Sequence, residues 1–89
     1  MEFNDRLKVL RETNGLTQAE IAQYVGVSRP TISGYETRGY QPSHEKLNKL
    51  AEIFSVSIDY LLNGGPQDNE LLQRHNERNK QLRITLSQR

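Results

Sequence analysis

The feature that most constrains this chain is a pair of short helical segments joined by a tight turn, within residues 18–37. The stretch TQAE at 17–20 is a capping box, in which a hydroxyl and a carboxylate satisfy free amides where a helix begins. Gly26 ends that helix at a position where a positive φ is expected. Ser28 is a good cap for the next helix, and Pro30 is tolerated in its first turn.

The apolar residues of this segment are spaced so that the two helices pack across each other. Ala22 lies at the expected crossing, where a larger side chain would push the helices apart. The other apolar positions that would hold the crossing angle are Ile21, Val25, Val27, Ile32 and Tyr35. Together these features form a helix-turn-helix pattern.

Three further helices are predicted around this pair. Apolar residues recur at helical spacing in Phe3–Thr13, in a segment that Ser43 caps and that ends at Phe54, and in a short segment that Ser57 caps. The stretch NGGP at 63–66 then closes the unit. We therefore expect an all-α fold, a compact domain of five helices over residues 1–65.

Residues 66–89 form a polar tail, rich in Asn, Gln and Arg, with a net charge of +2 against −1 for residues 1–65. Leu71, Leu72, His75 and Leu82 could line a helix, whereas Leu82, Ile84 and Leu86 alternate as in a strand. The periodicity leaves an extra helix and a linker both open.

Composition excludes several classes of protein. The chain has no cysteine, which excludes disulfide scaffolds and cysteine-ligated zinc. His44 and His75 lack the spacing of metal ligands, and no phosphate-binding glycine loop or nucleophile with a matched base is present. No apolar run is long enough to cross a membrane. We expect a cytoplasmic protein that is no enzyme and that needs no metal, cofactor or membrane.

Two stretches, RLKVLRETNGLTQAEIAQYVGVSRPTISGYE and QPSHEKLNKLAEIFSVSIDYLLNG, closely resemble the lambda-repressor-like, Cro-type helix-turn-helix family. The resemblance covers about residues 3–64. It implies a five-helix DNA-binding domain that places its third helix, residues 28–36, in the DNA major groove. It also implies a bacterial or phage-infected cell, with the protein on the nucleoid.

Base contacts are expected from the first turns of that helix. A guanidinium such as that of Arg29 can pair with both O6 and N7 of guanine. By resemblance, the positions that face bases are Ser28, Arg29, Pro30 and Gly34, and Ser33 adds a hydroxyl. Pro30 and Gly34 depart from the polar residues often found there: the first could pack on a thymine methyl, and the second could allow close approach.

Phosphate contacts and a structural ion pair complete the expected site. The candidates for phosphate contacts are Gln18, Thr31, Arg38 and Tyr40, although exposed residues of this kind are often only solvated. In the family that the chain resembles, the positions of Arg11 and Glu36 form a salt bridge, which we assign to stability.

We expect a sequence-specific regulator of transcription, a repressor that binds a palindromic operator on double-stranded DNA as a homodimer. The candidate dimer interface is Ile58, Leu61 and Leu62, or else the tail. The alternative is a protein-interaction module, such as an antitoxin or small regulator, whose main partner is another protein. An anti-repressor is a further candidate partner.

Overall fold

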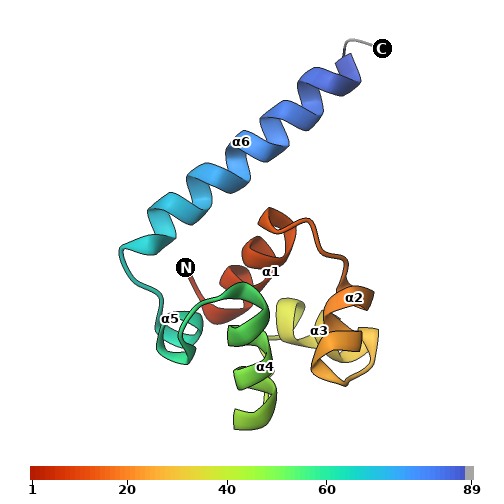
Figure 1. Cartoon of the computed structure of the whole chain (residues 1–89), viewed down its shortest axis with the longest axis vertical. Coiled ribbons are helices and arrows are strands. Elements are labelled where there is room, and N and C mark those ends of the chain that lie inside the picture. The colour runs from red at the N-terminus through yellow and green to blue at the C-terminus, as the bar shows by residue number, and fades with distance from the viewer. Residues whose placement is uncertain (88–89) are drawn as a thin grey trace.

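The computed structural model describes the backbone of residues 1–87 and the side chains of residues 1–77. Within these limits the chain consists of helices and loops without a strand, which confirms the predicted all-α class. The six helices (Figure 1) are α1 (Phe3–Thr13), α2 (Gln18–Val25), α3 (Arg29–Thr37), α4 (His44–Phe54), α5 (Ile58–Asn63) and α6 (Gln67–Ser87).

Side-chain caps explain why the helices begin where they do. The capping box at the start of α2 is formed, with the Thr17 hydroxyl accepting from the Glu20 amide at 3.1 Å and the Glu20 carboxylate accepting from the Thr17 amide at 2.9 Å. Ser28, Ser43 and Ser57 each accept from the amide three residues later. Gly26 ends α2 at a φ of +83°, a conformation that favours glycine.

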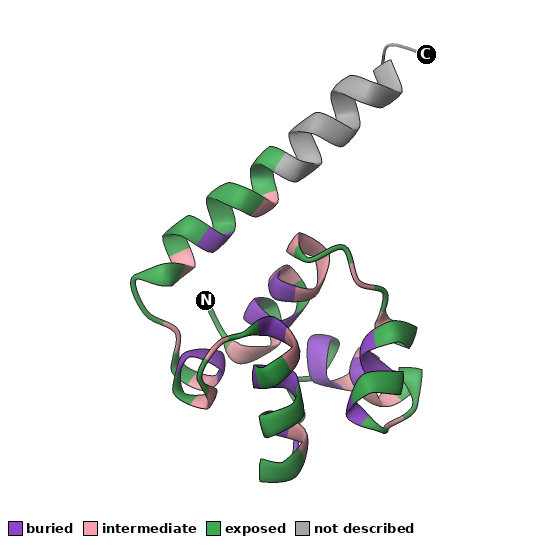
Figure 2. Cartoon of the chain, in the orientation of Figure 1, coloured by how far each residue is buried: buried purple, intermediate pink, exposed green. Residues whose placement is uncertain are grey.

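One hydrophobic core joins all six helices. Its fully buried members include Leu7 of α1, Ile21 of α2, Ile32 of α3 and Leu50 of α4. Figure 2 shows the buried residues on the faces that these helices turn toward one another. This shared core fixes α3 relative to its neighbours and leaves its opposite face exposed.

The segment after Gly65, for which the sequence left two structures open, forms α6. Its first turns pack on the rest of the molecule through Leu71, which is 3% exposed, and beyond them the helix runs away from the other five as a single rod (Figure 1). His75 Nε2 lies 3.4 Å from the carboxylate of Glu12 on α1. The tail therefore contributes to the core of the domain.

A buried arginine anchors α6. Arg6, only 1% exposed, donates to the carbonyl of Leu61 at 2.9 Å and to Asp68 Oδ1 at 3.2 Å. Tyr60 also donates to Asp68 Oδ1, at 2.8 Å. Burial and this bond raise the pKa of Tyr60 to about 12. Burial opposes the charge on Asp68, but the bonds from Arg6 and Tyr60 outweigh it and lower the pKa of Asp68.

The structure corrects one part of the expected dimer interface. Leu61 is fully buried in the core of its own chain, so it is not available to a second copy. Ile58 and Leu62 are half-buried and reach the surface. No helix within residues 1–87 combines the length and the apolar character needed to cross a membrane.

Candidate nucleic-acid interface

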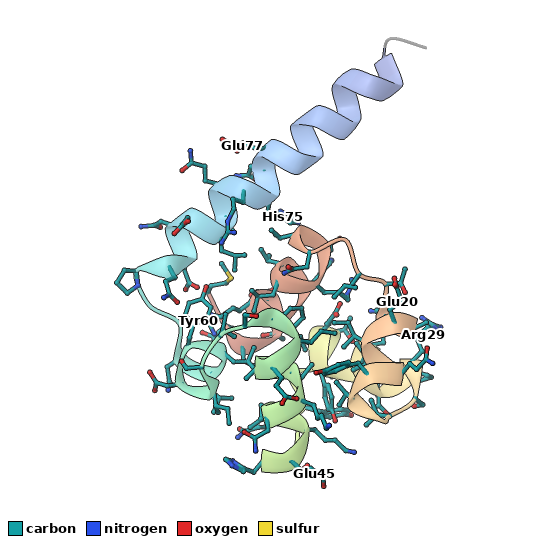
Figure 3. All side chains as sticks on the ribbon, viewed as in Figure 1. Glu20, Arg29, Glu45, Tyr60, His75 and Glu77 are labelled. Atoms are coloured by element: carbon teal, nitrogen blue, oxygen red, sulfur yellow. The ribbon has the colours of Figure 1, made fainter. Side chains whose placement is uncertain are left out.

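The exposed face of α3 carries the residues expected to contact bases. Ser28, Arg29 and Pro30 are exposed, and Ser33 and Gly34 are half-buried on the next turn. In Figure 3, Arg29 lies with Glu20 on the α2–α3 side, across the molecule from Tyr60 on α5. The helix is thus held by one face and presents these five positions on the other.

Ser28 and Thr31 bond to each other at the start of α3. The Ser28 hydroxyl accepts from the Thr31 amide at 3.3 Å, and the two hydroxyl oxygens lie 2.8 Å apart. Ser28 therefore serves first as the helix cap. Thr31, expected at a phosphate, is half-buried beside it.

A chain of hydrogen bonds runs from the exposed face of α3 to α1. Arg29 Nη1 donates to Gln18 Oε1 at 3.1 Å, and Gln18 Nε2 donates to Glu36 Oε1 at 3.2 Å. Glu36 also accepts two bonds from Arg11, at 2.7 and 3.1 Å. Both ends of the Gln18 amide are therefore occupied within the protein. This side chain holds Arg29 in place, a role that the sequence alone did not predict.

The ion pair in this chain is well shielded from water. The Glu36 side chain is 1% exposed and that of Arg11 is 13% exposed. The hydrogen bond and charge of Glu36 raise the pKa of Arg11, against the effect of burial. Arg11 also donates to the carbonyl of Leu16 at 2.9 Å. The pair thus ties α1, α3 and the loop before α2 into one unit.

Tyr40 folds back against α3. Gly39, with a φ of +68°, reverses the chain just after the helix, and the tyrosine ring then lies over Gly34. A Cβ atom at Gly34 would lie 3.1 Å from Cδ2 of the ring. Arg38 Nη1 donates to the tyrosine hydroxyl at 3.4 Å. The result is an open hollow of about 510 Å³ between α3 and the loop.

Charge on this face differs from the charge of the domain. Among residues 28–40 the cations are Arg29 and Arg38, both exposed, and the single carboxylate is Glu36, which is buried and paired. Residues 28–40 therefore expose positive charge although residues 1–65 carry a net charge of −1. A positive patch is the electrostatic footprint expected of a surface that meets phosphates.

Comparison with known proteins identifies the family. A family model described as helix-turn-helix matches residues 7–61, which is more than half of the chain. The HTH-type transcriptional activator BcrR of Enterococcus faecalis is 44% identical over 64 residues, which cover 72% of this chain and 31% of BcrR. The chain spans between 31% and 54% of the lengths of three curated relatives that it matches.

Solved structures share the fold. The P22 c2 repressor, in a crystal structure with a synthetic operator, matches with a TM-score of 0.70 and 32% identity, over 73% of this chain and 98% of that chain. A transcriptional regulator from Listeria innocua matches with a TM-score of 0.66 and 26% identity, over 98% of this chain and 91% of that one. The chain belongs to the helix-turn-helix family of transcriptional regulators, and its domain is of the lambda-repressor-like, Cro type.

Proposed function

We propose that this chain binds double-stranded DNA sequence-specifically through α3 and regulates transcription. The observation that carries the proposal is Arg29, exposed on the positive face of α3 and held there by Gln18. A guanidinium held at the start of a groove-binding helix can pair with a guanine edge and discriminate against other bases by about 1–3 kcal/mol. The P22 c2 repressor, with the same fold, is described in complex with an operator.

The contacts that we propose divide into two groups. Ser28, Arg29, Pro30, Ser33 and Gly34 face the base edges. Gln18, Thr31, Arg38 and Tyr40 lie beside the phosphates, where contacts position a protein without reading sequence. Gln18 also acts on the bases indirectly, because it orients Arg29.

The chain acts as a homodimer in this proposal. One small domain with a net charge of −1 and few cations would bind DNA weakly, and its affinity would fall steeply with salt. Joining two domains raises affinity through effective concentration. The surface-reaching residues of α5, Ile58 and Leu62, are the candidate contacts. The half-sites would then lie about 34 Å apart, one turn of the double helix.

Selection of binding sites from random duplex DNA at about 100 mM salt tests the DNA proposal. We expect the unchanged protein to enrich a palindrome that contains a guanine. The Arg29→Ala variant should show no preference for guanine at that position. Arg74→Ala, which removes an exposed arginine of α6, is the matched control and should keep the preference. A folded protein that enriches no site would contradict the proposal and would favour a protein partner.

We also propose that the regulator is a repressor. A dimer seated on an operator that overlaps a promoter blocks access to that promoter. A reporter gene placed behind the selected site should lose expression when the chain is produced and keep it with Arg29→Ala. A rise in expression would contradict the repressor proposal and leave the DNA-binding proposal standing.

Sedimentation tests the dimer. A protein that sediments as a monomer, both free and on the selected DNA, would contradict the homodimer.

A further inference from the structure

The glycine in the middle of α3 calls for an explanation, because glycine is unfavourable inside a helix. Gly34 lies on the exposed side, one turn after Pro30. Its missing side chain leaves the space that the ring of Tyr40 fills, with ring atoms 3.1 and 3.5 Å from where a Cβ atom would lie. Gly34 therefore brings an aromatic ring from the following loop directly onto the groove-facing helix.

Tyr40 is held in that position although it is 57% exposed. The positive φ of Gly39 turns the chain back, the ring rests on Gly34, and Arg38 donates to the hydroxyl. An aromatic ring that is both exposed and fixed in orientation is suited to making a contact outside the chain. Its exposed area contributes little to the fold of the monomer.

The hollow beside Tyr40 has an apolar part, hydroxyl groups and positive charge in its lining. Pro30, Gly34 and Tyr40 form the apolar part, and the lining also includes Thr31, Ser33, Thr37, Arg29 and Arg38. Among the side chains of residues 1–77, neither of these arginines forms an ion pair, and the one carboxylate of residues 28–40 is buried and paired with Arg11. The hollow thus suits an apolar group that is carried by a polyanion.

We propose that this hollow is a subsite for the 5-methyl group of thymine, with Tyr40 and Gly34 as specificity-determining residues. Base edges in the major groove offer hydrogen-bonding groups, and the methyl of thymine is the apolar group among them. The phosphates that border the groove complement Arg29 and Arg38. The inference rests on the DNA binding proposed above and extends it, because the ring of Tyr40 rather than only its hydroxyl faces the DNA.

Replacement of thymine by deoxyuridine, one position at a time in the selected operator, tests the subsite. The change removes only the methyl group. We expect one position in each half-site at which full-length protein binds about fourfold more weakly, the equivalent of about 0.8 kcal/mol for one buried carbon. Tyr40→Ala should bind the thymine and deoxyuridine duplexes equally. Tyr40→Phe, which keeps the ring and loses the hydroxyl, should still discriminate between them.

The outcomes separate this inference from the proposal on which it rests. If no operator can be selected, the DNA-binding proposal falls and the subsite falls with it. If an operator is selected but every thymine tolerates deoxyuridine, the subsite alone is overturned. The same holds if Tyr40→Ala discriminates as well as the unchanged protein. Gly34→Ala serves as a second variant. It leaves Tyr40 in the sequence but pushes its ring away from α3, so it should reduce the discrimination between thymine and deoxyuridine.

Discussion

At the scale of single residues, the most consequential group is the carboxylate of Glu36. It accepts two bonds from Arg11 and one from Gln18, and Gln18 in turn accepts from Arg29. A buried acid on α3 therefore supports an exposed arginine at the start of the same helix. The Arg11–Glu36 pair can be predicted from the family resemblance. The role of Gln18 depends on how α2 crosses α3, which residue spacing alone does not encode.

Glu36→Gln should lower the free energy of unfolding by about 1–3 kcal/mol, because Arg11 keeps its charge and loses its anionic partner. Urea unfolding at pH 7 measures the loss. Glu45→Gln, which changes an exposed glutamate on α4, is the control and should shift stability little. A midpoint for Glu36→Gln equal to that of the control would rule out a stabilising role for the pair.

The contact between Gly34 and Tyr40 predicts a coupling between two substitutions. Alanine is favoured over glycine inside a helix by up to about 1 kcal/mol. In the unchanged chain part of that gain is lost, because the new methyl meets the Tyr40 ring at 3.1 Å. Gly34→Ala should therefore stabilise the Tyr40→Ala variant more than it stabilises the unchanged chain. Equal gains in the two backgrounds, measured by urea unfolding, would show that the ring does not press on the helix.

At the scale of helices, local signals predicted the first five elements well. Each of the starts of α2 to α5 has a side-chain cap that can be read directly from sequence, and the apolar spacing marks the buried face. The third helix was predicted to end at Glu36, and α3 ends one residue later, at Thr37. Such signals act over three or four positions, so they can be recognised in the sequence without knowledge of the fold.

The sixth helix and its anchor could not be predicted in this way. Apolar residues are sparse in α6, so periodicity did not separate helix from strand. Arg6 lies in an amphipathic helix, where a charged residue normally indicates the solvated face. Its carboxylate partner, Asp68, lies 62 positions away in the sequence. A pairing over that distance becomes visible only once the tertiary fold is known.

Asp68→Asn should weaken the attachment of α6 by about 1–3 kcal/mol at neutral pH, because it removes the charge that Arg6 and Tyr60 bind. The folded-state pKa of Asp68 is lowered. Its stabilisation is therefore present above the unfolded value, near about 3.9, and is lost as pH falls through the folded pKa. Urea unfolding of both proteins should differ at pH 7 and converge near pH 2. A difference that persists unchanged in acid would contradict this ionic role.

At the scale of the whole molecule, Arg29 on the exposed face of α3 and Tyr60 in the anchor of α6 lie on separate sides (Figure 3). The chain of bonds from Arg29 to Arg11 ends on α1, and Arg6 begins its own set of bonds from the same helix. Helix α1 thus joins both halves, with one arginine tied to α3 and another tied to α5 and α6. We therefore expect α6 to stabilise residues 1–65 through these contacts.

Removal of residues 66–89 should therefore destabilise the rest. The truncated chain loses the burial of Leu71, about 1.5–3 kcal/mol, and the bonds between Arg6 and Asp68, about 1–3 kcal/mol. Arg6→Met tests the contribution of the Arg6–Asp68 bonds. In the full chain its cost in unfolding free energy includes the loss of the Arg6 partner of Asp68. We expect Arg6→Met to cost clearly less in the truncated chain than in the full chain, measured by thermal unfolding of all four proteins. Equal costs would show that Arg6 serves only α1 and α5, and that α6 is held by its apolar contacts.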